Sequence, residues 1–179
     1  MNGRIKCAAL VALAVFGGMS VTAKAVTVGD KLTDLSVKGF SDGELNEGAL
    51  KGKVTVVNFW ATWCASCKVE LVEMEQKFIG LLEKKNFKLA FVSVDKDPQA
   101  AAEWVKKNLK TPDKFLSFLY KDPEYATAES LNLDSFPMTL VVDHEGVVRQ
   151  IQRGYVEGKG STEQLAKTAD ELLAKIKAN

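Results

Sequence analysis

The segment Trp63-Cys64-Ala65-Ser66-Cys67 places two cysteines two residues apart, between an apolar run and a helical pattern. A disulfide at this spacing closes a loop of about one helical turn, and so short a loop constrains the unfolded chain very little. Stabilising the fold is therefore a poor use for such a pair, whereas electron exchange is a good one. The spacing predicts a redox-active disulfide and dithiol at the start of a helix.

The amino terminus predicts a secretory signal. A basic start is followed by an apolar run over residues 8–23 and by the small residues of Ala23-Lys24-Ala25, which match a cleavage site. The alternative is an uncleaved membrane anchor, but this run is shorter than the roughly 20 residues of a spanning helix. We expect residues 1–25 to be removed together with Cys7, which leaves a single domain over residues 26–179.

Composition limits the partners of the predicted mature domain. Cleavage removes three of the 24 basic residues and none of the 23 acidic ones, so the net charge becomes slightly negative. No basic block stands out, and nucleic acid or an anionic membrane surface is therefore not an expected partner. Export implies an oxidising compartment, yet Cys64 and Cys67 alone are too few for a disulfide scaffold.

The order of the predicted elements indicates an α/β fold. Residues 54–60 are β-branched and aromatic with little alternation, as in a central strand buried on both faces. A hairpin with an Asp42-Gly43 turn is expected before this strand. Further strands are predicted at 87–94, 115–119, 138–142 and 147–152, and helices from the cysteines to about 85 and at 98–109, 123–131 and 161–177. Early strands that alternate with helices, followed by a final hairpin, predict a central mixed β-sheet flanked by helices.

The two cysteines have different expected roles. Cys64 precedes the helix, where unpaired N–H groups and the helix dipole favour a thiolate, so it is the expected nucleophile. Cys67 begins the apolar stripe of that helix and is the expected resolving thiol. A metal site would need about four ligands, and the mature chain adds only the distant His144 to the two cysteines. We therefore expect no metal and no cofactor beyond the dithiol.

Glu70 is a candidate proton carrier. It follows Cys67 by three residues and so lies on the same helix face, beside the buried stripe. Partial burial would raise the pKa of its carboxyl toward neutrality. The alternative is an ordinary solvated glutamate, which is the expectation for the neighbouring Glu73, Glu75 and Glu83.

The run from Val56 to Lys68 resembles the active-site segment of the thioredoxin superfamily, and more narrowly the exported TlpA/ResA-like thiol–disulfide oxidoreductases. The likeness extends from Gly52 through Phe136-Pro137-Met138-Thr139 to Gly154. It implies a thioredoxin-like fold with an N-terminal hairpin and a central strand and helix insertion, a periplasmic location and a monomer.

The resemblance also implies further site residues. Pro137 would be the cis-proline that faces the dithiol, and Phe136 would present backbone groups to a bound substrate. Trp63 would wall the dithiol and offer an apolar surface to partners. Relatives have a functional glutamate at the position of Glu70, and Asn58 stands where thioredoxin has a buried aspartate.

The function implied by the resemblance is reduction of disulfides in exported proteins, of which apocytochrome c is one client in the family, with re-reduction by a membrane thiol donor. A dithiol oxidant would use the same residues in the opposite direction. A copper chaperone would need a third soft ligand, for which His144 is the candidate. A peroxidase of the superfamily is the remaining alternative, but Trp63 precedes Cys64 and a resolving cysteine follows it at once.

Overall fold

The computed structural model describes residues 25–32, 37–39, 44–112, 116–119, 131 and 133–177. The strands within these ranges form one seven-stranded mixed sheet of order β2-β1-β5-β4-β3-β6-β7. The elements are β1 (Val37–Gly39), β2 (Glu44–Leu45), α1 (Glu47–Leu50), β3 (Val54–Trp60), α2 (Ala65–Leu82), β4 (Phe87–Ser93), α3 (Pro98–Asn108), β5 (Leu116–Leu119), β6 (Met138–Val142), β7 (Val148–Arg153) and α5 (Ser161–Lys177).

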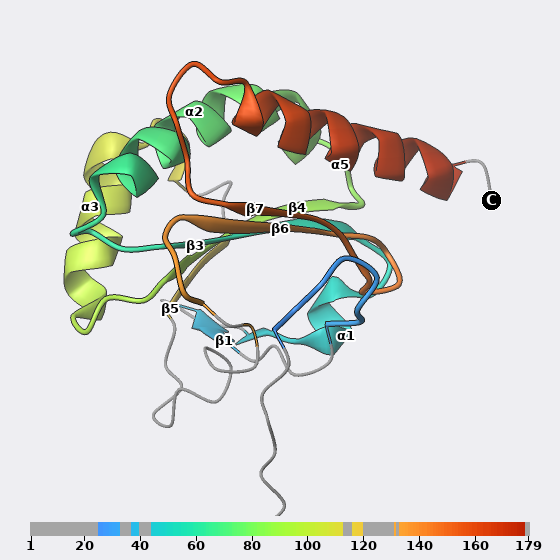
Figure 1. Ribbon diagram of the computed structural model, residues 1–179, viewed down its shortest axis with the longest axis horizontal. Coiled ribbons are helices and arrows are strands. Elements are labelled where there is room, and N and C mark those ends of the chain that lie inside the picture. The colour runs from blue at the N-terminus through green and yellow to red at the C-terminus, as the bar shows by residue number, and fades with distance from the viewer. Residues whose placement is uncertain are drawn as a thin grey trace, which may run out of the picture.

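Strand β3 lies at the centre of the fold, and all seven of its residues are buried. It pairs in parallel with β4 and antiparallel with β6. Helices α2 and α5 lie side by side over one face of the sheet, and α1 lies under the other (Figure 1). Two covered faces explain why the β3 sequence lacks the alternation of a half-exposed strand.

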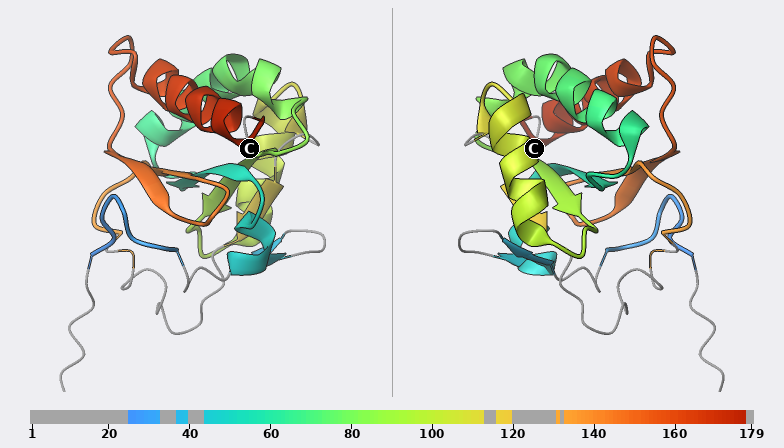
Figure 2. Two further views of the ribbon diagram at one scale, coloured as in Figure 1. Left: turned by 90° about the vertical axis from the view of Figure 1, so that its right-hand side faces the viewer. Right: turned by 90° about the vertical axis from the view of Figure 1, so that its left-hand side faces the viewer.

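Successive residues of β3 point to opposite faces and contribute to two separate cores. Val54, Val56 and Trp60 pack in the cluster that includes α2, α3 and α5. Val57 and Phe59 pack in the second cluster, with α1 and the segment before it. The alternation assigns Asn58 to the α2 face, which becomes important at the site. The two further views in Figure 2 show the helices on the two sides of the sheet.

Most of the predicted elements are confirmed. The bounds of β3, β6 and α5 agree with the sequence prediction, and β1 pairs with β2 as the expected hairpin. Its Asp42-Gly43 turn lies outside the described residues, as do residues 1–24 of the predicted signal and all of the predicted 123–131 helix except Leu131. The short helix α1 was missed, although Asn46 caps it by accepting a hydrogen bond from the Ala49 N–H. None of the helices formed by the described residues is both long and apolar enough to cross a membrane.

Candidate active site

The two cysteines lie where β3 leads into α2. Cys64 is the N-cap of α2, and its Sγ accepts a hydrogen bond from the Cys67 N–H at 3.2 Å. The two residues are joined by a disulfide. Cys64 is 8% exposed, whereas Cys67 is completely buried. The N–H groups at the start of a helix stabilise negative charge, so reduction leaves Cys64 with the more favourable environment for a thiolate.

Hydrogen bonds to Asp95, two residues after the end of β4, hold the loop before Cys64. The Asp95 carboxylate accepts hydrogen bonds from the Thr62 N–H at 2.9 Å and the Thr62 Oγ1–H at 2.7 Å. The Ser93 hydroxyl donates to the same carboxylate at 2.8 Å. Charged acceptors of this kind make stronger hydrogen bonds than neutral ones. The loop that presents Cys64 is therefore tied to the end of β4.

The second loop of the site carries Phe136 and Pro137. The peptide between them is cis, as the resemblance implied. The Phe136 ring meets the Trp63 ring edge to face, with centroids 5.7 Å apart. Trp63 is nevertheless 67% exposed, so most of its indole surface remains open to a partner. The two loops thus contact each other through aromatic rings beside the dithiol.

Glu70 lies inside the protein, one helical turn beyond Cys67. Its side chain is completely buried and is hydrogen-bonded to Asn58 and Gln152, the two outer members of a row of polar residues across three strands. Asn58 is paired with Thr139, and Thr139 with Gln152, in the registers of β3, β6 and β7. Asn58 Nδ2 donates to one carboxyl oxygen of Glu70 at 2.8 Å and to Thr139 Oγ1 at 2.8 Å. Gln152 Nε2 donates to the other carboxyl oxygen at 2.7 Å.

This environment changes the acidity of Glu70. Desolvation disfavours the charged carboxylate and is the largest effect, opposed by the hydrogen bonds from Asn58 and Gln152. The net result raises the pKa of Glu70 to about 7. A group with such a pKa exchanges its proton near neutral pH, which suits general acid and base chemistry.

The family of the chain follows from comparison with known proteins. Residues 27–169 match the model of the redoxin family, and these residues include both loops of the site. The chain belongs to the redoxin family. Over 72% of its length, this redoxin is 33% identical to the thiol:disulfide interchange protein DsbE of Pseudomonas aeruginosa, 67% of which is covered.

Two further comparisons support the same activity and fold. The redoxin is 27% identical to the thiol-disulfide oxidoreductase ResA of Geobacillus kaustophilus, over 73% of the chain and 71% of that relative. The thioredoxin domain of a thiol-disulfide oxidoreductase from Bacteroides vulgatus has the same fold, with a TM-score of 0.65, 19% identity, and 81% and 99% of the two chains covered. With its Cys64–Cys67 pair, the redoxin is a thiol–disulfide oxidoreductase of the DsbE/ResA type.

The structure brings together the residues named from the sequence and adds others. Cys64, Cys67 and Glu70 lie within one stretch of α2 and its cap, and Trp63 contacts Phe136 beside Pro137. Thr139, Gln152 and Asp95 were missed. The positions of Thr139 and Gln152 in the site depend on the register between strands, which cannot be read from the sequence. Asp95 follows a buried strand, and that position could have marked it.

The expectation that Glu75 is solvated was wrong. Its side chain is only 5% exposed and accepts hydrogen bonds from the Thr111 N–H at 2.6 Å and the Thr111 Oγ1–H at 2.9 Å. These bonds satisfy a carboxylate that would otherwise be costly to bury. Glu75 therefore attaches the segment after α3 to α2 rather than facing solvent.

Proposed function

We propose that this redoxin is a periplasmic reductant of disulfides in exported proteins. The observation that carries the proposal is the asymmetry of the dithiol. Cys64 keeps an exposed fraction of 8% at the N-cap of α2, whereas Cys67 is completely buried on the same helix as the buried Glu70. Such an asymmetry suits one thiol that meets the client and a second that acts only after the first has reacted.

In the first step the Cys64 thiolate attacks one sulfur of the client disulfide. A bond forms between Cys64 Sγ and that sulfur, the client disulfide breaks, and the second client sulfur leaves as a thiolate. The helix N-terminus and the Cys67 N–H favour the attacking thiolate before the reaction. The product is a mixed disulfide between the redoxin and its client.

In the second step Cys67 resolves the mixed disulfide. The Cys67 thiol loses its proton and attacks Cys64 Sγ, the Cys64–Cys67 bond forms, and the client cysteine leaves and takes up a proton. The client gains two electrons and the dithiol loses two. We assign the proton transfer at Cys67 to Glu70, whose raised pKa and position one turn along the helix support this role.

The aromatic loops are the proposed client surface. The exposed face of Trp63 offers apolar area, and Phe136 and Pro137 border it on the second loop. Tryptophan is well suited to such surfaces because it supplies a large contact area with few rotatable bonds. A segment of client chain held here would bring its disulfide to Cys64.

The charge around the dithiol supports reduction of the client as the direction of electron flow. Ala65 and Ser66 between the cysteines are neutral, and the buried Glu70 carboxyl opposes a full negative charge nearby. A strongly oxidising pair requires a strongly stabilised thiolate, so this arrangement favours a reductant. The names of its relatives, a thiol:disulfide interchange protein and a thiol-disulfide oxidoreductase, support disulfide exchange as the reaction. Exported clients, a membrane thiol donor and cytochrome c maturation as one candidate pathway are part of the proposal.

The copper-chaperone alternative loses support because of the position of His144. The His144 carbonyl accepts a hydrogen bond from the Gly52 N–H, just before β3, whereas Cys64 follows the other end of that strand. Seven strand residues span about 23 Å. A third ligand from His144 is therefore out of reach of the dithiol.

Replacement of the resolving cysteine tests the proposal. In the native compartment, Cys67→Ser should accumulate mixed disulfides between Cys64 and its clients, because the second step is blocked. Mass spectrometry of the trapped complexes would identify the clients. Cys64→Ser is the matched control and should trap far less. Trapping by Cys64→Ser alone would overturn the assignment of Cys64 as nucleophile.

A further inference from the structure

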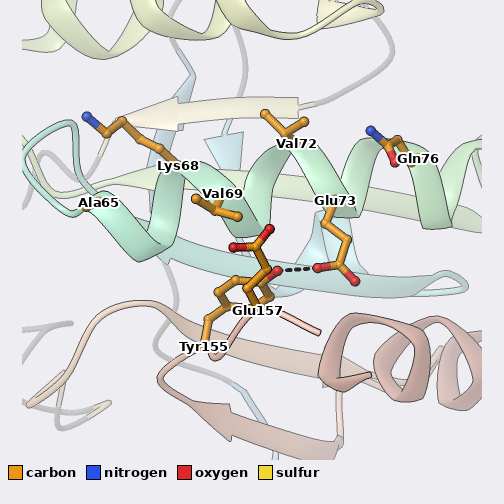
Figure 3. Close-up of a pocket in the computed structure, with 8 residues that line it drawn as sticks. All are labelled: Ala65, Lys68, Val69, Val72, Glu73, Gln76, Tyr155 and Glu157. Carbon is orange, nitrogen blue, oxygen red and sulfur yellow. Dashed lines mark hydrogen bonds between the residues drawn. The ribbon is translucent and has the colours of Figure 1, made fainter. Parts of the chain in front are cut away.

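A pocket of about 550 Å³ lies on the outward side of α2, next to the dithiol. Its α2 side runs from Ala65 to Gln76, and Tyr155 and Glu157 from the loop after β7 form its other side. We call it the α2 groove. Figure 3 shows Val69 and Glu73 pointing toward Tyr155 and Glu157, whereas Lys68, Val72 and Gln76 point toward the opposite side of the helix.

The far wall of the groove is fixed to the rest of the site. The Tyr155 hydroxyl donates a hydrogen bond to Glu73 on α2. The Gly154 N–H donates to the Pro137 carbonyl at 2.7 Å, which ties the same loop to the cis-proline. The near end of the groove begins at Ala65, the residue after Cys64. The groove is therefore continuous with the surface at which the client disulfide reacts.

The lining changes in character along the groove. Lys68 also lines the pocket near the dithiol, but it points toward the opposite side of α2 from Tyr155 (Figure 3). On the side that faces Tyr155, Val69 is 41% exposed and the adjoining Val156 is 62% exposed, so this side is apolar near the dithiol. Two carboxylates follow, from Glu73 on α2 and Glu157 on the loop. A complementary chain would present an apolar side chain first and a positive charge farther along.

The dimensions of the groove fit a short extended peptide. At a rise of 1.5 Å per helical residue, the distance from Ala65 to Gln76 is about 16 Å, which is the length of roughly five extended residues. On the same scale Val69 lies roughly two residues from the client cysteine, and Glu73 lies roughly four residues from it.

We propose that the α2 groove binds the client segment next to its reactive cysteine and selects an apolar residue close to that cysteine followed by a basic residue. The inference rests on the proposed function, since it names the class of polypeptide that the same dithiol reduces. Glu73 and Glu157 supply the charge preference, and Val69 supplies the apolar contact.

Two synthetic peptides test this preference. In each peptide, one central cysteine forms a mixed disulfide with thionitrobenzoate, and leucine stands two residues away on both sides. Four residues from the cysteine, again on both sides, one peptide has arginine and the other has glutamate. The Cys64 thiolate attacks the peptide sulfur, coloured thionitrobenzoate leaves as a thiolate, and Cys67 then releases the peptide thiol. We expect kcat/KM for the arginine peptide to exceed that for the glutamate peptide by about three- to tenfold, and the ratio to fall as salt is raised.

Charge variants assign the preference to the groove. Glu157→Lys should abolish or reverse the ratio, because it replaces one of the two carboxylates by a cation. Glu145→Lys makes the same change in net charge in the β6–β7 turn, at the opposite end of the sheet, and should keep the wild-type ratio. An equal effect of both variants would overturn the assignment to the groove.

The remaining outcomes separate this inference from the proposed function. If the reduced protein reacts with both peptides at the same rate, the groove does not select the client, and the proposed function stands. If it reacts with neither, the proposed function itself fails. A preference that disappears as protein concentration rises would indicate a second copy of the chain in the groove, which would also overturn the inference.

Discussion

At the scale of single residues, Glu70 is the group whose chemistry the fold changes most. A free glutamate has a pKa near 4.5, whereas burial raises the pKa of Glu70 to about 7. Between these values the folded protein keeps a proton that the unfolded chain releases. The free energy of unfolding therefore falls as pH rises through this window, by about 3 kcal/mol in total, and levels off above it.

This linkage predicts a difference between the wild type and Glu70→Gln. The variant lacks the titrating group, so its free energy of unfolding should lose this component of the decline between about pH 4.5 and 7. Urea unfolding at a series of pH values, with the disulfide kept oxidised, measures the slope. Glu171→Gln removes an exposed carboxyl on α5 and should keep the wild-type slope. Equal slopes for wild type and Glu70→Gln would contradict the buried titration.

The sequence predicted some residues of the site but not others, for physical reasons. Cys64, Cys67 and Glu70 were predictable because helical spacing relates residues within one element. Asn58 could be noted as a polar residue in an apolar strand. Gln152, by contrast, is 82 residues from Glu70 in sequence. It reaches Glu70 only because β7 pairs with β6 and β6 pairs with β3 in the observed registers. Side chains that meet across strands leave no periodic signal.

At the scale of elements, the start of α2 depends on Asp95. Its carboxylate accepts two hydrogen bonds from Thr62 and one from Ser93. Thr62 lies between β3 and α2, so the backbone hydrogen bonds of a helix or strand do not hold it in place. Asp95→Ala should lower the free energy of unfolding by about 2 kcal/mol, because partly buried donors lose a charged acceptor. It should also slow the reaction of Cys64 with a small disulfide, because the loop that positions Cys64 is released.

Asp97, two residues farther along the chain, provides the control for Asp95→Ala. Asp97 caps α3 by accepting a hydrogen bond from the Gln99 N–H at 2.9 Å. Asp97→Ala should cost about 1 kcal/mol of stability as a lost helix cap, but leave the reaction rate of Cys64 unchanged. Denaturant unfolding and stopped-flow kinetics on both variants measure the two effects. Equal rates in the two variants would show that Asp95 has no positioning role.

Element boundaries were predictable where composition changes sharply. The β-branched run of β3 and the Ser161 start of α5 agree with the structure. The helical stripe of α2 was also correct, since Cys67 and the apolar residues that follow it at helical spacing are buried. Glu75 was misjudged because its partner Thr111 belongs to another part of the chain. Periodicity identifies the apolar face of a helix, but it does not identify the polar residues that a neighbouring segment covers.

At the scale of the whole molecule, the reduction potential compares the complete fold with and without the Cys64–Cys67 bond. A strong oxidant has a potential near −120 mV because the reduced form is the more stable one, whereas a reductant lies near −270 mV. Since 30 mV corresponds to about 1.4 kcal/mol for two electrons, these directions differ by about 7 kcal/mol. The difference is large enough for a single measurement to decide between them.

The neutral Ala65 and Ser66 and the buried Glu70 predict a potential nearer −270 mV than −120 mV. The protein should be equilibrated with mixtures of reduced and oxidised dithiothreitol, and its free thiols counted after alkylation. Glu70→Gln should raise the potential, because it removes the carboxyl that opposes a thiolate. A wild-type value near −120 mV, with a reduced form that resists urea better than the oxidised form, would reverse the direction while leaving the dithiol chemistry intact. If Glu70→Gln had the same reduction potential as the wild type, Glu70 would not contribute to the difference in free energy between the reduced and the oxidised pair.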